Sequence, residues 1–199
     1  FVDRARRITV GDPLDEKTIV GPMISKAHLA KVRSYIELGP KEGATLLCGG
    51  LDQPRYAAEL PEAVKHGNFV WPTVFADVGN RMRIAQEEIF GPVLVVFKAK
   101  TLSEALIIAN GTDYALTGGC YSRSPANLKR VRQEFLVGNL YLNRPITGAL
   151  VARQPFGGYK LSGIGSKAGG PDYLKQFLIP VNSTENTLRR GFAPVAEVE

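Results

Sequence analysis

The chain has 199 residues, of which 44% are hydrophobic and 22% charged, a composition typical of folded globular proteins and unlike that of disordered chains. Its length suits one well-cored domain, or one domain with an appended arm. The net charge of +6 is spread over small basic clusters interleaved with acids, which argues against nucleic-acid binding, and no apolar run approaches the ~18 residues needed to cross a membrane.

The N-terminal part predicts two helices separated by a loop. The chain begins with Phe1 rather than methionine, inside a helix-like pattern, so we expect it to be part of a longer protein. A second helix is predicted from about Ser25, because apolar residues recur there at helical spacing. It is expected to end at Gly39 and Pro40, since proline cannot continue a helix.

Three strand-like segments follow. Residues 44–50 predict a short buried strand, and residues 69–78 predict extended chain. Residues 93–100 are a nearly continuous apolar run with β-branched side chains, which is typical of a strand buried on both faces of a parallel sheet.

Two helices with clear start signals come next, and further strands are predicted on either side of the second. Thr101 and Glu104 have the spacing of a capping box. Ser124 and Pro125 are expected to begin the second helix, and Gly138 to end it. Strands that alternate with helices predict an α/β fold, with a mainly parallel sheet and helices on both faces.

The C-terminal part contains a glycine-rich segment and a tail. Ordering glycine-rich backbone is entropically costly, so such a segment indicates that the backbone must approach a ligand or another segment closely, and residues 144–171 are therefore a candidate site. We assign residues 1–178 to one domain and residues 179–199 to an arm. Residues 181–188 have extended-chain side chains but no hairpin partner, so we expect a strand that pairs with another chain in a homo-oligomer built on a dimer.

Two motifs carry most of the functional information. The first, QEEIFGPV, places two carboxylates directly before an aromatic residue and a Gly-Pro turn. The second, RQPFGGYKLSGIG, begins at Arg153. In order and spacing the two resemble signatures of the aldehyde dehydrogenase family. Taken singly, they could be a solvated acid pair and a glycine-rich surface loop.

The resemblance implies an oxidoreductase that uses NAD. Glu88 would hold both hydroxyls of the nicotinamide ribose, a task for which an acceptor-only carboxylate is suited. Phe90 would pack beside the nicotinamide, and Phe156 would line the substrate tunnel. Residues 1–178 would then be part of the catalytic domain, and residues 179–199 its oligomerisation strand and tail.

A loop of small residues, Thr147, Gly148 and Ala149, bears on the substrate. Backbone N–H groups around a glycine can form a concave anion site. The loop is similar to the one with which the glutamate-semialdehyde branch of the family grips the substrate α-carboxylate. This implies oxidation of L-glutamate 5-semialdehyde, derived from 1-pyrroline-5-carboxylate, to L-glutamate in proline catabolism; a plain tight turn and a dehydrogenase of another aldehyde are the alternatives.

No catalytic residue is assigned. Cys48 and Cys120 lie in apolar strand contexts that favour inert thiols, at positions that the family does not use for catalysis. The nucleophile and the NAD-binding domain are expected upstream in the longer chain, so the 199 residues alone are expected to be inactive; a noncatalytic binding module that keeps the fold is the alternative. His28 and His66 are the only histidines, so no metal site is predicted, and two cysteines without a disulfide pattern favour a cytoplasmic location.

Overall fold

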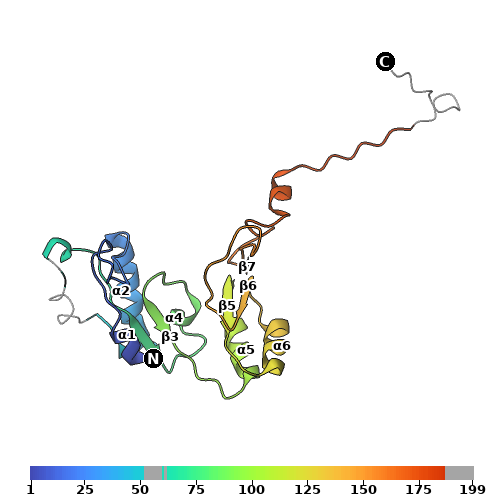
Figure 1. Ribbon diagram of the computed structural model, residues 1–199. Coiled ribbons are helices and arrows are strands. Elements are labelled where there is room, and N and C mark those ends of the chain that lie inside the picture. The colour runs from blue at the N-terminus through green and yellow to red at the C-terminus, as the bar shows by residue number, and fades with distance from the viewer. Residues whose placement is uncertain (52–59, 61, 187–199) are drawn as a thin grey trace. The chain divides into compact units, whose positions relative to one another are not determined.

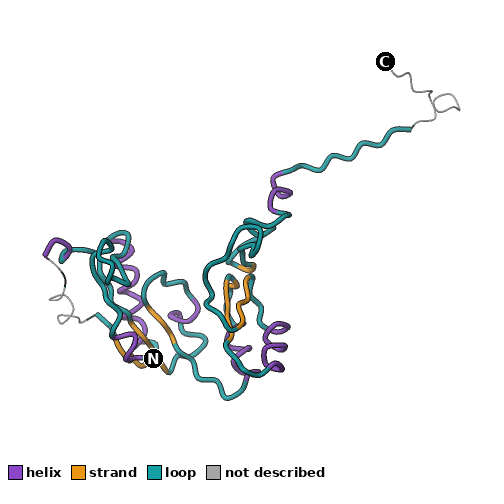
Figure 2. Tube along the Cα trace, in the orientation of Figure 1, coloured by secondary structure: helices purple, strands orange, loops and turns teal. Residues whose placement is uncertain are grey.

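The computed structural model describes residues 1–51, 60 and 62–186, and Figures 1 and 2 show their path and secondary structure. The chain forms two compact units. The first unit consists of Phe1–Asp113 and Cys120–Leu136, and the second of Tyr114–Gly119 and the chain from Val137 onward. The predicted boundary between residues 178 and 179 stays a prediction.

The first unit is built on a three-stranded sheet. Its strands are β1 (Thr45–Cys48), β2 (Thr73–Ala76) and β3 (Val93–Val95), in that order across the sheet. β1 runs antiparallel to β2, whereas β2 and β3 are parallel. The sheet is therefore mixed, where the sequence predicted a mainly parallel one.

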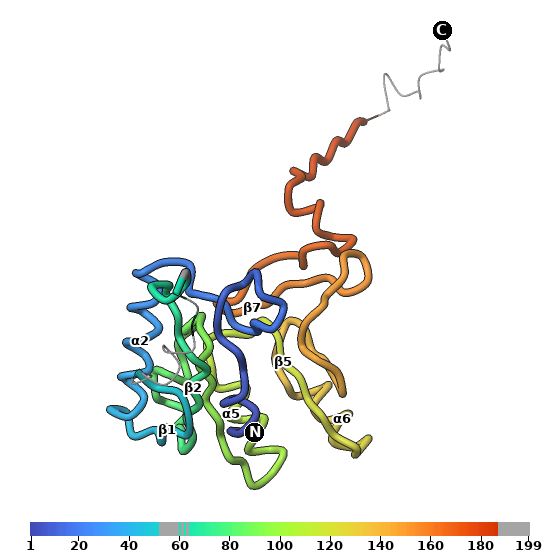
Figure 3. Tube along the Cα trace, turned by 60° about the vertical axis from the view of Figure 1, so that its left-hand side comes forward, coloured from blue at the N-terminus to red at the C-terminus, as the bar shows by residue number. Residues whose placement is uncertain are grey.

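Helices cover both faces of this sheet, as predicted. The helical segments of the unit are α1 (Val2–Arg6), α2 (Lys26–Lys41), η1 (Glu62–Val64), α4 (Arg83–Gln86), α5 (Leu102–Asn110) and α6 (Pro125–Glu134). Successive side chains of a strand point to opposite faces. In β2, Val74 shares a buried cluster with Ala5 of α1, whereas Phe75 shares one with Val32 of α2. Thus α1 and α2 lie on opposite faces, and Figure 3 shows α2 alongside β1.

Two predictions for this unit need correction. Helix α2 continues through Pro40 to Lys41. Pro40 cannot donate to the Ile36 carbonyl, but the helical pattern continues past it, because the N–H of Glu42 donates to the carbonyl of Leu38 over 2.9 Å. Strand β3 is not buried on both faces, since it lies at the sheet edge and Leu94 is 45% exposed.

Helix α5 begins as its sequence predicts. The Thr101 hydroxyl accepts a hydrogen bond from the backbone N–H of Glu104 over 3.1 Å. The Glu104 carboxylate in turn accepts from the backbone N–H of Lys100 over 2.6 Å, one residue before the position used in a standard capping box. The bond from Glu104 satisfies one of the N–H groups that a helix start leaves without partners, and the bond from Lys100 holds the residue before the cap.

Helix α6 lies beside α5 (Figure 1) and begins as predicted but ends differently. Ser124 accepts from the N–H of Asn127 over 3.3 Å, and Pro125 is the first helical residue. The helix ends at Glu134, so Gly138 does not terminate it. A Cβ atom at Gly138 would lie 2.1 Å from the Gly157 carbonyl oxygen, and the glycine is needed for that close backbone approach.

The second unit contains two short strand pairs. Strand β4 (Tyr114–Ala115) pairs antiparallel with β7 (Tyr159–Lys160), and β5 (Thr117–Cys120) pairs with β6 (Asn139–Leu142). The 3-10 helix η2 (Tyr173–Phe177) follows. All of the predicted strands up to residue 142 are therefore present, and the α/β class is confirmed.

The predicted tail strand at residues 181–188 falls partly outside the described residues. Residues 181–186 have no regular secondary structure and are drawn as loop in Figure 2. Residues 187 and 188 are not described. Pairing of this segment with another chain stays a prediction.

Candidate functional site

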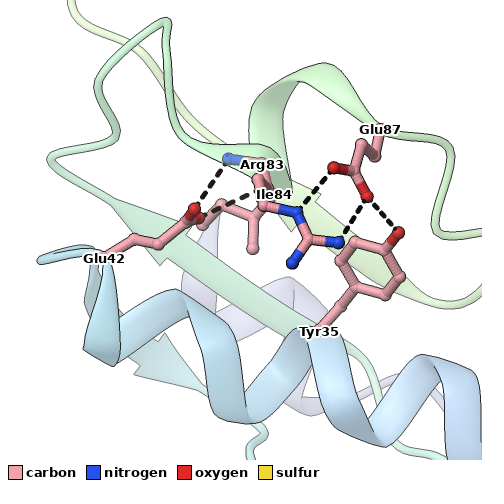
Figure 4. Close-up of polar contacts among 5 residues, drawn as sticks. All are labelled: Tyr35, Glu42, Arg83, Ile84 and Glu87. Atoms are coloured by element: carbon pink, nitrogen blue, oxygen red, sulfur yellow. Dashed lines mark hydrogen bonds and ion pairs between the residues drawn. The ribbon is translucent and has the colours of Figure 1, made fainter.

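A polar network holds the chain just before the QEEIFGPV turn (Figure 4). At the start of α4, the Glu42 carboxylate accepts from the backbone N–H groups of Arg83 and Ile84 over 2.9 and 3.2 Å. The Arg83 guanidinium donates to both oxygens of Glu87 over 2.6 and 2.9 Å, and the Tyr35 hydroxyl donates to one of them over 2.5 Å. Glu87 thus links α4 to α2 through Arg83 and Tyr35.

The pKa values of this network follow from its hydrogen bonds. Donation from Arg83 and then from Tyr35 lowers the pKa of Glu87 from 4.5 to about 2. The same bonds raise the pKa of Tyr35 and of Arg83, because each partner favours the state in which Glu87 is ionised and the donors keep their protons. Glu87 is therefore a fixed anion at neutral pH.

Glu88, the predicted ribose-binding residue, has different surroundings. Its carboxylate is exposed and accepts no hydrogen bond from the described residues, while its backbone carbonyl accepts from Lys31 Nζ over 2.9 Å. The next residue, Ile89, is buried in the core. Phe90 follows with a φ of 62° and a 73% exposed ring, whose centroid lies 6.1 Å from that of His28. An available carboxylate and an exposed aromatic ring therefore flank a buried anchor.

The α2 residues that contact this turn were not predicted from the sequence. His28, Lys31 and Tyr35 contact Phe90, Glu88 and Glu87, respectively. They are spaced three and four residues apart, so they lie along one side of α2. In the sequence, these three residues recur at helical spacing next to the buried apolar residues of α2, and that pattern could have identified them.

The predicted substrate loop lies in the second unit, after β6. Gly148 has a φ of 81°, in the left-handed region that favours glycine. The carbonyl of Thr147 accepts from Arg144 Nη2 over 3.3 Å. In the orientation of the Gln154 amide that gives both of its ends partners, its nitrogen donates to the carbonyl of Gly148 over 3.0 Å. Within the described part of the chain, the N–H groups of Gly148 and Ala149 donate no hydrogen bond. Two backbone donors are thus available in this loop.

Phe156 is held in an extended backbone segment beside an open pocket. Its N–H and carbonyl exchange hydrogen bonds of 2.9 Å with the carbonyl and N–H of Ala168. Its ring is 39% exposed and lines a pocket of about 460 Å³, together with apolar side chains that include Ile164, Tyr173 and Phe177. This pocket is compatible with the predicted role in lining a substrate path.

The six predicted site residues are divided between the units. Glu88 and Phe90 belong to the first, whereas Thr147, Gly148, Ala149 and Phe156 belong to the second. Glu88 and Phe90 lie on one turn, and Thr147, Gly148 and Ala149 lie on one loop, whereas Phe156 lies on a separate extended segment paired with Ala168. Their predicted roles in binding a cofactor or a substrate stay predictions.

The cysteines and the potential metal ligands form no second candidate site in the described part of the chain. Cys48 is buried in the core at the end of β1, and Cys120 is partly buried at the end of β5. Among residues 1–51, 60 and 62–186, no three His, Cys, Asp or Glu side chains gather as a metal site. No helix of this same part is both long and apolar enough to span a membrane.

The chain is similar to known proteins over most of its length. It is 50% identical to 1-pyrroline-5-carboxylate dehydrogenase of Geobacillus sp. (strain WCH70) over 173 residues, which are 87% of this chain and 32% of that protein. A crystal structure of 1-pyrroline-5-carboxylate dehydrogenase from Thermus with bound NAD superposes with a TM-score of 0.78 and 49% identity, over 88% of this chain and 32% of that one.

Betaine aldehyde dehydrogenase from Staphylococcus aureus is a more distant structural relative, with a TM-score of 0.79 and 35% identity over 89% of this chain and 34% of that one. The chain thus spans about a third of the length of the relatives it matches. The model of the aldehyde dehydrogenase family matches residues 1–181. The chain therefore belongs to the aldehyde dehydrogenase family.

Proposed function

We propose that this chain is the C-terminal portion of an NAD-dependent enzyme that oxidises L-glutamate 5-semialdehyde, formed from 1-pyrroline-5-carboxylate, to L-glutamate in proline catabolism. The higher identity to 1-pyrroline-5-carboxylate dehydrogenases than to betaine aldehyde dehydrogenase favours this substrate over another aldehyde. We call the protein that contains this chain and the proposed catalytic cysteine the complete enzyme.

The observation that carries the substrate assignment is the pair of available N–H groups at Gly148 and Ala149. Glutamate semialdehyde differs from simple aldehydes in carrying an α-carboxylate, whose oxygens require hydrogen-bond donors. Successive backbone N–H groups beside a left-handed glycine provide such donors without a bulky side chain. A site of this kind favours an aldehyde with a carboxylate at its far end.

The cofactor assignment rests on Glu88 and Phe90. The acceptor chemistry fits, since the Glu88 carboxylate keeps two acceptor oxygens free while its own backbone carbonyl is held by Lys31 and the next residue, Ile89, is buried in the core. Glu88 would accept the two ribose hydroxyls, and Phe90 would pack beside the nicotinamide. When bound, NAD supplies the hydride acceptor of the oxidation. The chain's own contribution is to orient the cofactor so that the reacting face is presented to the substrate.

The remaining parts of the proposal concern the complete enzyme. Neither Cys48 nor Cys120 is proposed as the nucleophile, so we expect no turnover from the 199 residues alone. We propose that the nucleophile and the NAD-binding domain lie elsewhere in the same protein, that the enzyme is a homo-oligomer built on a dimer, and that it acts in the cytoplasm, where cysteines stay reduced.

The substrate assignment can be tested by replacing Gly148 with valine in the complete enzyme. A β-branched residue is unfavourable at a φ of 81° and would turn the loop N–H groups away from their present directions. We expect KM for glutamate semialdehyde to rise about tenfold or more, with a change of less than about twofold for an unsubstituted aldehyde such as pentanal, measured by NADH formation.

Gly21→Val is the matched control. The φ of Gly21 lies outside the left-handed region, and an added Cβ atom would only touch Pro13 at an ordinary 3.6 Å. It should leave both KM values unchanged. Equal losses on the two substrates after Gly148→Val would contradict the assignment of the loop to the carboxylate.

A further inference from the structure

Two polar side chains enclose the substrate loop. Arg144, which precedes the loop, donates from Nη2 to the carbonyl of Thr147 over 3.3 Å and from Nη1 to the side-chain oxygen of Gln154 over 3.0 Å. Gln154, which follows the loop, donates from its amide nitrogen to the carbonyl of Gly148 over 3.0 Å. This orientation of the amide is the one in which both of its ends find partners.

We propose that Arg144 and Gln154 form a clamp that positions the N–H groups of Gly148 and Ala149 for the substrate carboxylate and thereby sets the preference for a carboxylate-bearing aldehyde. The inference rests on the proposed function and extends it to two residues outside the loop. They are positioning residues, because they act through the loop backbone.

The geometry of the peptide bond explains how the clamp works. No peptide bond among the described residues is cis, and in a trans peptide the C=O of one residue points opposite to the N–H of the next. Holding the Thr147 carbonyl therefore directs the Gly148 N–H away from Arg144. Holding the Gly148 carbonyl likewise directs the Ala149 N–H away from Gln154. The two carbonyls held by the clamp belong to the same peptide groups as the two N–H groups that have no partner in the described chain.

The clamp is itself anchored to the fold. The Arg144 guanidinium lies 5.2 Å from the ring centroid of Tyr141, which is buried in β6. On the other side, Gln154 is followed by Pro155, whose carbonyl accepts from Asn139 Nδ2 over 2.9 Å. Asn139 also belongs to β6. Both ends of the loop are thus fixed to one strand, so the loop conformation is set before a substrate arrives, which reduces the ordering cost of binding.

The chemical types of the two residues fit this role. A guanidinium has five N–H donors in a rigid plane, so Arg144 can hold a carbonyl and an amide oxygen at once. Only an amide can accept from Arg144 with its oxygen and donate to Gly148 with its nitrogen. A glutamate at position 154 would keep the first contact but oppose the Gly148 carbonyl with a second acceptor.

The test uses Gln154→Glu and Arg144→Met in the complete enzyme. Each variant should raise KM for glutamate semialdehyde about tenfold, and raise the dissociation constant of the product glutamate by a similar factor, because the loop donors lose their orientation. For pentanal, which has no carboxylate, kcat and KM should change by less than about twofold. The dissociation constant is measured by titration calorimetry and does not depend on turnover.

Arg153→Met is the matched control. It removes the same charge from the same region, but the exposed Arg153 side chain contacts neither of the two loop carbonyls. It should leave the preference for the carboxylate substrate intact. If Arg144→Met fails to fold, Gln154→Glu decides the question. If the two variants have the same KM values as the control, or lose activity equally on both substrates, the clamp is refuted while the proposed function stands. A wild-type enzyme without preference for glutamate semialdehyde over pentanal would overturn the proposed function, and the clamp with it.

Discussion

Glu87 and Glu88 are adjacent residues with the same side chain but different surroundings. Glu87 accepts three hydrogen bonds from Arg83 and Tyr35, whereas the Glu88 carboxylate accepts none from the described residues. A carboxylate that is already saturated by donors is poorly suited to binding a ligand. The structure therefore supports the proposal that Glu88, and not Glu87, receives the ribose hydroxyls.

Replacing Glu88 by glutamine in the complete enzyme tests this assignment. An amide accepts hydroxyl hydrogen bonds less strongly than a carboxylate, so we expect the single-turnover rate of hydride transfer to fall about tenfold and the affinity for NAD to weaken. The melting temperature should not change, because the Glu88 side chain accepts no hydrogen bond from the described residues and the bond from Lys31 goes to the backbone carbonyl. Glu37→Gln, at an exposed position on α2, is the control. Wild-type single-turnover kinetics in Glu88→Gln would show that Glu88 is only a surface acid.

Glu87→Gln should instead change the dependence of stability on pH. The folded-state pKa of Glu87 is about 2, below its usual 4.5, so its ionised form stabilises the folded protein above pH 4.5. This contribution is lost as the pH falls from 4.5 toward 2. We expect the melting temperatures of wild type and variant to differ most above pH 5 and to converge near pH 2.

Glu134→Gln is the matched comparison for that experiment. Glu134 pairs with Arg130 four residues earlier over 2.8 Å, and this pair lowers its pKa. Ser103 also accepts from Arg130, but among the described residues no second side chain donates to Glu134 as Tyr35 donates to Glu87. Its effect should be smaller, as is usual for exposed helix pairs. A difference between wild type and Glu87→Gln that stays constant from pH 7 to pH 2 would refute the role of Glu87 ionisation.

At the scale of whole elements, the features that depend on residues close together in the sequence, such as helix starts, were predicted correctly. The starts of α5 and α6 depend on Thr101 and Ser124, whose side chains bond to N–H groups three residues ahead. Such contacts can be read from a short stretch of sequence. The role of Gly138 could not, because it depends on a backbone segment at residues 157 and 158 that only the fold brings close.

The same distinction applies to the candidate site. Glu88 and Phe90 could be selected because they belong to a short motif. That Glu87 is engaged by Tyr35, 52 residues earlier, depends on how α2 packs against the turn. Likewise, the contact between Arg144 and Gln154 closes a loop of irregular backbone, for which hydrophobic periodicity gives no prediction.

The cap of α5 gives a test at this scale. Thr101→Ala removes the acceptor for the N–H of Glu104, so we expect a loss of about 1 kcal/mol in the free energy of unfolding. Thr101→Ser keeps a hydroxyl at the same place and should retain most of the stability. Both are measured by urea denaturation of the complete enzyme. Equal stability of the alanine variant and wild type would mean that the observed contact does not stabilise the helix.

At the scale of the whole molecule, the C-terminal end of the described chain presents apolar side chains to solvent. The exposed positions are Leu174, Phe177, Leu178, Ile179 and Val181. A run of exposed apolar residues is unfavourable in water and is typical of a surface that another protein segment covers. The segment thus has the composition expected of the predicted oligomerisation arm, although residues 181–186 have no regular secondary structure in the single chain.

Shortening the complete enzyme after Leu178 should therefore disrupt its assembly. Removal of the arm takes away the segment proposed to pair with a neighbouring subunit, so we expect monomer or aggregate where the intact enzyme sediments as a dimer or larger oligomer. Val181→Asp should weaken assembly in the same direction, because a charge would be placed at a position whose apolar side chain is 86% exposed in the single chain. Asn182→Asp introduces the same charge at the neighbouring polar position and serves as the control. Analytical ultracentrifugation distinguishes these cases, and a truncated enzyme that still sediments as the intact oligomer would show that the arm is dispensable for assembly.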